Sequence, residues 1–297
     1  MRSLITTLML VLLACPAAAA TGDAEAEGTT GNATATTWYL ALGDSVAAGW
    51  EPVGPEAYDN RTRASYPDQL WLMARGHYPN LQLVNLACPG ENTETIRIDN
   101  ERCQYEHGSQ LAEALAFIDE HGDELAFITI DIGFNDFPCT DGLSCLFPGI
   151  DNIEARLPGI LEELQAAAPG TPIVGMNIYD PYLTMWLDED SRALAQQSVV
   201  AIQLVNEALE KAYGEAGIPV ADVEAAFQIE EWDTLVPVAG YGEVPLNLAL
   251  LCERSWMCHP PPLGPDRHPN VLGFRVMAEA FATELGLDPV GVDLGPG

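Results

Sequence analysis

The chain has 297 residues, 48% of them hydrophobic, which is enough apolar material for one large buried core and excludes a wholly disordered protein. Lys and Arg number 12 and Asp and Glu number 44, so the formal net charge is −32 at pH 7. A field of that sign repels nucleic acid and anionic membrane surfaces, and neither is expected as a partner.

Residues 1–20 have the features of an export signal. Arg2 gives the positive start, an apolar run follows from Leu4 to Ala14, and small residues at 18–20 offer a cleavage site. A lipoprotein signal with Cys15 as the lipidated residue is the alternative. We therefore expect a secreted protein. Residues 21–36 are expected to form a flexible linker, and no later segment is apolar enough to span a membrane in the mature chain.

Removing the signal leaves six of the seven cysteines, an even number that predicts disulfides in an exported chain. Proximity in the sequence favours three pairs, which are Cys88–Cys103, Cys139–Cys145 and Cys252–Cys258. A zinc site is the alternative, but the chain has no Cys-x-x-Cys spacing, so no metal is expected.

The apolar run Tyr39 to Leu42 predicts a buried strand near the start of one domain over residues 37–287. The run stops at Gly43-Asp44-Ser45. A serine at the end of a strand in an α/β sheet stands at the edge where such sheets bind ligands. We interpret Ser45 as a nucleophile, which needs a base and donors for an oxyanion. A turn with an Asp-Ser helix cap is the alternative interpretation of this tripeptide.

Helices and strands are expected to alternate along the rest of the domain. Further strands are predicted over residues 81–87, 125–132, 172–178 and 218–223. Helices are predicted from Ser65-Tyr66-Pro67 and over residues 110–121, 150–168, 191–217 and 271–285. Residues 52–63 are expected to form a loop over the site, 232–265 a binding wall or lid without helix, and 288–297 a tail. This order predicts an α/β fold with a mostly parallel sheet covered by helices on both faces.

Polar residues and glycines follow the other predicted strands or precede the last helix. Gly90 follows one strand, where glycine lets the backbone approach a ligand and present its N–H. Asn135 follows another strand, and its amide can donate to an oxyanion, although an Asx turn is the alternative. His268 stands just before Asn270, the predicted cap of the last helix. His259, between Cys258 and three prolines, is the rival base.

Four blocks occur together in the order Gly43-Asp44-Ser45, the Gly90 turn, Gly133-Phe134-Asn135-Asp136 and His268-Pro269-Asn270. In this order and spacing the chain resembles the SGNH (GDSL-type) hydrolases over about residues 38–287, most of all their secreted, three-disulfide bacterial esterases and lipases. The resemblance implies a flavodoxin-like three-layer α/β/α sandwich and no cofactor. It implies Ser45 as nucleophile, His268 as base, and the N–H groups of Ser45 and Gly90 with the Asn135 amide as the oxyanion hole.

Two positions depart from the family pattern. Many members have an aspartate three residues before the histidine, but here that residue is Pro265, and Asp266 stands two before. Either the Asp266 carboxylate orients His268, or a backbone carbonyl near Pro265 does so and the machinery is a dyad. Phe134 stands where many relatives have glycine and is expected to narrow the pocket.

The expected activity is hydrolysis of a small-molecule, lipid or sugar ester through an acyl-enzyme, by a monomeric secreted enzyme. A polysaccharide O-deacetylase using the same chemistry is one alternative, and a non-catalytic binding protein on the same scaffold is another. Five aromatic residues are candidates for pocket walls, namely Trp50, Phe137, Tyr179, Trp186 and Trp256.

Overall fold

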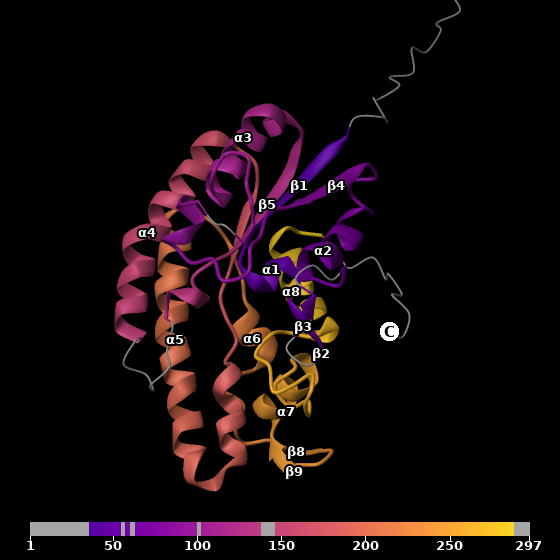
Figure 1. The fold of residues 1–297 in the computed structure, drawn as a ribbon, viewed down its shortest axis with the longest axis vertical. Coiled ribbons are helices and arrows are strands. Elements are labelled where there is room, and N and C mark those ends of the chain that lie inside the picture. Colours follow the sequence, from indigo (N-terminus) through magenta and orange to yellow (C-terminus); the bar gives the residue numbers. More distant parts are fainter. Residues whose placement is uncertain (1–35, 55–56, 60–62, 100–101, 138–145, 288–297) are drawn as a thin grey trace, which may run out of the picture. The chain divides into compact units, whose positions relative to one another are not determined.

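The computed structural model describes residues 36–54, 57–59, 63–99, 102–137 and 146–287, which Figure 1 draws as a coloured ribbon. The expected export signal, the linker up to residue 35, Cys15 and the tail at 288–297 lie outside these ranges. The expected pair Cys139–Cys145 also lies outside them. Within the described ranges, no helix combines the length and the apolar character needed to cross a bilayer.

A parallel sheet forms the centre of the described domain, with its five strands in the order β4-β1-β5-β6-β7. Its strands are β1 (Thr37–Gly43), β4 (Leu81–Asn85), β5 (Leu125–Asp131), β6 (Ile173–Met176) and β7 (Val220–Ala221). Numbered along the chain, this order is 2-1-3-4-5, which is the flavodoxin-like arrangement. The chain changes direction across the sheet between β1 and β5, and such switch points are where open α/β sheets bind ligands.

Helices cover both faces of this sheet, so the predicted α/β fold is confirmed. In Figure 1, α3 (Gln110–His121), α4 (Leu146–Ala167) and α5 (Arg192–Glu215) stand together on one side, while α2 (Tyr66–Ala74) packs on α8 (Val271–Glu284) on the other. The remaining helices are α1 (Ser45–Ala48), α6 (Val223–Phe227) and α7 (Leu246–Arg254). Short 3₁₀ turns span Thr95–Arg97, Gly122–Glu124, Phe134–Asp136, Pro181–Leu187 and Glu189–Ser191.

Local sequence signals set the first strand and the two helices that flank the site. Residues 39–42 of β1 are fully buried, as expected for a strand with helices on both faces. The Ser65 hydroxyl accepts a hydrogen bond from the Asp68 N–H and caps α2. Asn270 caps α8 through the N–H groups of Leu272 and Gly273. Both caps were predicted from the sequence.

Two expectations about loops were wrong. Residues 52–63 include a small antiparallel hairpin, β2 (Glu51–Gly54) with β3 (Ala57–Asp59), instead of a plain loop. The stretch 232–265 contains the hairpin β8 (Leu235–Val238) and β9 (Gly242–Pro245) and then the helix α7. The helix α7 has only 9 residues, and Leu248 and Leu251 are its buried apolar side chains. Two apolar positions do not establish a helical period in the sequence.

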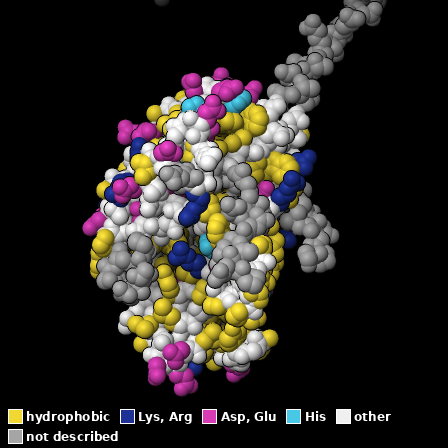
Figure 2. Space-filling view, in the orientation of Figure 1, with side chains coloured by type: hydrophobic (Ala, Val, Ile, Leu, Met, Phe, Trp, Pro, Cys, Tyr) yellow, Lys and Arg dark blue, Asp and Glu magenta, His cyan; other side chains and the backbone are white. Residues whose placement is uncertain are grey.

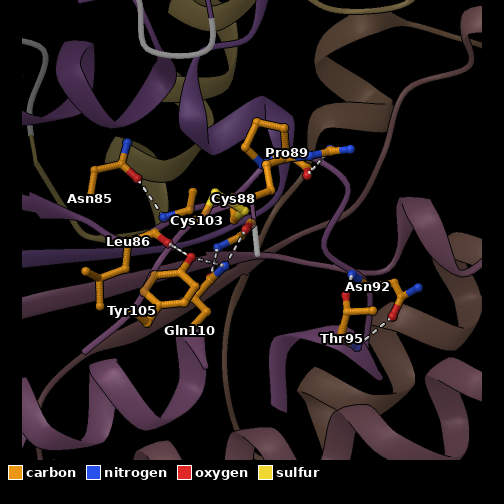
Figure 3. The surroundings of a disulfide bond; sticks show 12 residues. Asn85, Leu86, Cys88, Pro89, Asn92, Thr95, Cys103, Tyr105 and Gln110 are labelled. Atoms are coloured by element: carbon orange, nitrogen blue, oxygen red, sulfur yellow. Dashed lines mark hydrogen bonds between the residues drawn. A yellow bond between two sulfur atoms is a disulfide. The ribbon is translucent and has the colours of Figure 1, made fainter. Parts of the chain in front are cut away.

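Two of the three expected disulfides are formed by described residues. Cys88–Cys103 joins residues 15 apart and Cys252–Cys258 joins residues 6 apart. On the chain-entropy account the longer loop stabilises the fold by about 3 kcal/mol. Figure 3 shows the first disulfide between the end of the β4 segment and the chain that leads into α3.

Candidate active site

Ser45 lies at a sharp turn where β1 ends and α1 begins. Gly43 has φ +146°, and a Cβ atom there would lie 1.4 Å from the Asp131 Oδ1 atom, so the turn requires glycine. The Asp44 carboxylate accepts a 2.8 Å hydrogen bond from the Val46 N–H and thereby caps α1. The serine is 9% exposed, at the carboxyl edge of the sheet beside the switch point.

Side chains from distant parts of the chain fix the backbone of this turn. The Gln110 amide oxygen accepts from the Gly43 N–H at 2.7 Å, and its Nε2 group donates to the Gly43 carbonyl at 2.9 Å. Asp131 Oδ1 accepts from the Asp44 N–H at 3.2 Å. In Figure 3, Gln110 lies beside Tyr105, whose hydroxyl donates to the Leu86 carbonyl. The position of Ser45 therefore depends on β5 and on the start of α3.

The structure brings Ser45, His268 and Asp266 into one hydrogen-bonded chain. His268 Nε2 lies 3.0 Å from Ser45 Oγ, and His268 Nδ1 lies 2.7 Å from Asp266 Oδ1. The same carboxylate oxygen accepts the His268 backbone N–H at 2.9 Å. Of the two interpretations left open by the sequence, this geometry favours orientation of the ring by the Asp266 carboxylate.

The pKa values of two aspartates in the site shift in opposite directions. Partial burial opposes ionisation of Asp266, but the hydrogen bonds and charge of His268 outweigh it, so the pKa of this carboxyl lies below its ordinary value. Burial raises the pKa of Asp44 to about 6, against hydrogen bonds and the charges of His268 and Arg267 that lower it. Burial also raises the pKa of Asp131, with the neighbouring Asp44 charge adding to the effect.

A compact loop carries His268 and Asp266. The Trp256 N–H donates to the His268 carbonyl at 3.1 Å, and the Asp266 N–H donates to the Trp256 carbonyl at 3.1 Å. An isolated bridge pairs Ser255 with Pro269 just before α8. The rival base His259 packs its ring on Trp256 at 4.6 Å and does not line the pocket next to Ser45.

The expected oxyanion donors differ in how they are placed. Among the described residues, neither the Ser45 N–H nor the Gly90 N–H donates to a protein acceptor. Gly90, at φ +88°, belongs to a turn that starts beside Gly43, where the Cys88 N–H donates to the Gly43 carbonyl at 3.1 Å. Asn135 Nδ2 donates to Asp44 Oδ2 at 2.8 Å and to the Glu91 carbonyl at 2.9 Å. The Asn135 amide therefore lies beside the nucleophile turn with both hydrogens already engaged.

A narrow, mostly apolar pocket opens beside Ser45 and His268. Its free space is about 30 Å³, which is room for only one or two water-sized groups. It is lined by Asp44, Ser45, Val46, Asp131, Ile132, Phe134, Met176, Ile178, Tyr179, Arg267 and His268. Of the five aromatic candidates only Tyr179 lines it, and the Trp50 ring lies 6.1 Å from the His268 ring. No residue of the expected wall at 232–265 contributes to it.

Several residues of the site were not predicted from the sequence. Asp44 stood out only as part of a motif, and the contributions of Gln110, Asp131 and Arg267 were not recognised. Asp131 carried a usable signal, because a carboxylate at the end of a buried apolar strand is costly unless a function or a partner requires it. In the part of the chain that the structure describes, no group of three or more His, Cys, Asp or Glu side chains could hold a metal ion.

A parallel α/β sheet with a Ser–His–Asp chain at its switch point is an arrangement used by serine hydrolases. The model of the GDSL-like Lipase/Acylhydrolase family matches residues 41–276, and the chain belongs to this family. It is thus an enzyme of the carboxylic ester hydrolase class. A search of curated proteins gives no match.

Solved structures with the same fold come from several bacteria. An extracellular lipase from Streptomyces rimosus has 20% identity and a TM-score of 0.53, covering 84% of this chain and 100% of the lipase. A GDSL-like lipase from Parabacteroides merdae has 15% identity and a TM-score of 0.54, covering 85% and 96%. An acetylxylan esterase from Geobacillus stearothermophilus has 18% identity and a TM-score of 0.51, covering 86% and 97%. At these identities the likeness concerns the fold.

Proposed function

We propose that this enzyme hydrolyses esters through a covalent acyl-enzyme on Ser45. The observation that carries the proposal is the continuous hydrogen-bonded path from Ser45 Oγ through the His268 ring to the Asp266 carboxylate. Ser45 Oγ attacks the ester carbonyl while His268 Nε2 takes its proton and then gives it to the leaving alcohol. Water, activated by the same imidazole, then attacks the acyl-enzyme and releases the acid.

The oxyanion formed in each step is assigned to the N–H groups of Ser45 and Gly90, with Asn135 as the third donor. The first two are supported by the lack of any other acceptor for them in the described part of the chain. Asn135 must release either Asp44 or the Glu91 carbonyl to reach the oxyanion, since both of its amide hydrogens are engaged. Such a donor is typically worth about 10²–10³ in turnover.

The small pocket supports a short acyl group such as acetyl as the preferred acyl part of the substrate. About 30 Å³ of free space between Phe134, Tyr179 and Met176 accommodates a methyl group but no long chain. This observation also favours the second candidate function, O-deacetylation of a sugar. The fold likeness to an acetylxylan esterase is compatible with it. Secretion is proposed from the export signal and is consistent with the disulfides.

A series of nitrophenyl esters of rising chain length, together with acetylated xylan, tests the proposal. We expect the highest kcat/KM on the acetate and a steady fall with chain length. Ser45→Ala and His268→Ala should each lose at least about 10⁴-fold in kcat. Ser191→Ala is the matched control, since this partly exposed serine bonds to Asp188 away from the pocket.

Turnover that survives in Ser45→Ala would refute the acyl-enzyme mechanism. A wild-type protein that binds esters or acetylated sugars but converts none of them would instead support the binding-protein alternative.

A further inference from the structure

The pocket beside Ser45 carries a positive charge that the hydrolytic mechanism does not use. Resting on the proposed function, we infer that Arg267 binds an anionic group on the alcohol part of the substrate. The preferred substrates are then short-acyl esters of alcohols that carry a carboxylate or a phosphate.

The guanidinium of Arg267 is held at the entrance of the site. Arg267 lies between Asp266 and His268 in the chain, and its side chain lines the same pocket as Ser45. Its Cζ atom stacks over the Phe134 ring, 5.1 Å from the centroid, which restricts the plane of the guanidinium. The Tyr179 hydroxyl donates to the Arg267 carbonyl and fixes the backbone from the other side. The residue is exposed, so its charge faces incoming substrate.

The donor groups of Arg267 have no protein acceptor among the described residues. Guanidinium carries five N–H donors, and none of them makes a hydrogen bond or an ion pair within 4.0 Å. Other basic side chains do have carboxylate partners, in the pairs Arg97–Glu163, Arg156–Glu94, Lys211–Glu154, Arg254–Glu253 and Arg275–Glu279. Arg75 also has no carboxylate partner among the described residues and lies over the Trp71 ring, so Arg267 is distinguished by its position in the pocket beside Ser45.

The charge of Arg267 opposes the rise in the pKa of Asp44 and helps to lower the pKa of Asp266, but neither carboxylate forms an ion pair with it. Asp44 is engaged by the Val46 N–H and by Asn135, and Asp266 is engaged by His268. Figure 2 shows basic side chains near the middle of the face that it draws, beside a histidine, while acidic side chains gather along the top, left and bottom edges. Such a distribution attracts anions to the centre of the face, although the net charge of the protein is strongly negative.

The position of Arg267 indicates which part of the substrate carries the anion. The pocket that includes Phe134, Tyr179 and Met176 is mostly apolar, and the proposed function places the short acyl group there. Arg267 lines this pocket and is also exposed, so its guanidinium can contact the part of the substrate that projects from the pocket. With the short acyl group inside the pocket, that part is the alcohol. A carboxylate or phosphate on the alcohol can take two parallel N–H donors from an arginine, which fixes its orientation as well as its charge.

Matched acetyl esters test this inference. The anionic substrates are 4-acetoxybenzoate and 4-acetoxyphenyl phosphate, and the neutral reference is methyl 4-acetoxybenzoate. We expect Arg267→Gln to lower kcat/KM for the anionic esters by about 10- to 100-fold, chiefly through KM, and to change the neutral ester less than about 3-fold. Arg267→Lys should recover part of the loss, and added salt should narrow the preference of the wild type.

Arg192→Gln is the matched control, because Arg192 stacks over Trp186 at 4.1 Å in the same way but does not line the pocket. Its preference for anionic esters should equal that of the wild type. Equal losses on anionic and neutral esters in Arg267→Gln would overturn the inference and make Arg267 a residue that only supports the His268 loop. A preference for the anion that persists in Arg267→Gln would overturn it as well.

Binding measurements separate this inference from the proposed function. Calorimetric titration of 4-acetoxybenzoate into Ser45→Ala and into Ser45→Ala/Arg267→Gln needs no turnover. If the wild type hydrolyses no ester but the anion still binds more tightly in a way that depends on Arg267, the inference stands and the hydrolytic function is rejected. Equal binding of the anionic and the methyl ester would reject the inference alone.

Discussion

The two sides of the proposed catalytic arrangement are held in place in different ways. The turn at Gly43-Asp44-Ser45 is fixed by Gln110, Asp131 and Asn135, which are 67, 87 and 91 residues away in their hydrogen bonds to it. The loop with Asp266 and His268 is fixed mainly by its own neighbours. There the bonds run from His268 to Asp266, two residues away, and between Asn270 and Glu253, 17 residues away.

The geometry of each side depends on different parts of the fold. The turn that carries Ser45 depends on β1, β5 and the start of α3, because its hydrogen-bond partners lie on those elements. The histidine loop depends mainly on the residues that follow α7 and on the start of α8, with one long-range hydrogen bond from the Tyr179 hydroxyl to the Arg267 carbonyl. Substitutions on the nucleophile side should therefore change the stability of the whole domain, and those on the histidine side should chiefly change catalysis.

Asp266→Asn is the sharpest test on the histidine side. We expect kcat to fall by about 10⁴-fold, because an amide no longer holds the imidazole in the tautomer that accepts the Ser45 proton. The thermal midpoint should fall only modestly, because the amide oxygen that replaces the carboxylate can still accept the His268 backbone N–H although the charge beside the imidazole is lost. Steady-state kinetics on nitrophenyl acetate and a thermal melt measure both. Asp190→Asn, at an exposed position on the turn before α5, is the control.

A loss smaller than about tenfold in Asp266→Asn would return the assignment to a dyad in which a backbone carbonyl orients the ring. A large loss of activity accompanied by unfolding would contradict the difference between the two sides, because the histidine loop would then depend on the whole fold as much as the serine turn does.

Gly43→Ala tests the nucleophile side. The added methyl group would lie 1.4 Å from Asp131 Oδ1 at a backbone φ of +146°, so the turn must move. We expect a loss of more than about 4 kcal/mol in the free energy of unfolding, measured by urea denaturation, with activity lost in parallel. Gly240→Ala is the control, because Gly240 has φ +86° with nothing within 4 Å of the added atom. It should cost only about 1–2 kcal/mol.

If Gly43→Ala folds with normal stability, the Asp131 side chain can move aside to make room for the added methyl group. The turn is then less constrained than its contacts indicate. Normal stability with lost activity would show that the turn adjusts at the expense of the Ser45 position alone.

The sequence predicted the parts of this fold that depend on continuous or periodic signals. The apolar run before Ser45 located β1, and Asn270 located the start of α8 and with it His268. The hydrogen bonds between Gln110 and Gly43 could not be predicted in this way, because a contact between residues 67 apart produces no pattern in the sequence. The helix α7 was not predicted because 9 residues directly after a hairpin are too few to establish a helical period.

The choice between Asp266 and a backbone carbonyl had the same limit. The number of residues before His268 favours neither group, because the conformation of the turn decides which oxygen reaches the His268 ring. In the structure the turn directs Asp266 Oδ1 to both the ring and the backbone N–H of His268, and a single carboxylate oxygen serves both donors.

The pH dependence of stability should differ in sign between the two sides. Burial raises the pKa of Asp44 from its ordinary value of 3.8 to about 6, so the folded state holds this proton more tightly than the unfolded chain does. Its contribution to stability is complete below pH 3.8 and declines as the pH rises to about 6. The pKa of Asp266 is lowered, so its contribution is present above the ordinary pKa and is lost as the pH falls.

Urea denaturation of the wild type, Asp44→Asn and Asp266→Asn from pH 3 to 7.5 measures both contributions. The wild type should lose stability relative to Asp44→Asn as the pH rises from 4 to 6, and it should gain stability relative to Asp266→Asn as the pH rises from 3. The readout is the slope of the free energy of unfolding against pH. Its absolute value is not used, because the amide introduced in Asp44→Asn places a donor against the Asn135 amide donor and lowers stability by an amount that does not depend on pH. If the stabilities of the wild type and Asp44→Asn change with pH in parallel, Asp44 is not the carboxyl whose pKa is raised on the serine side. The group that binds the proton would then be its neighbour Asp131.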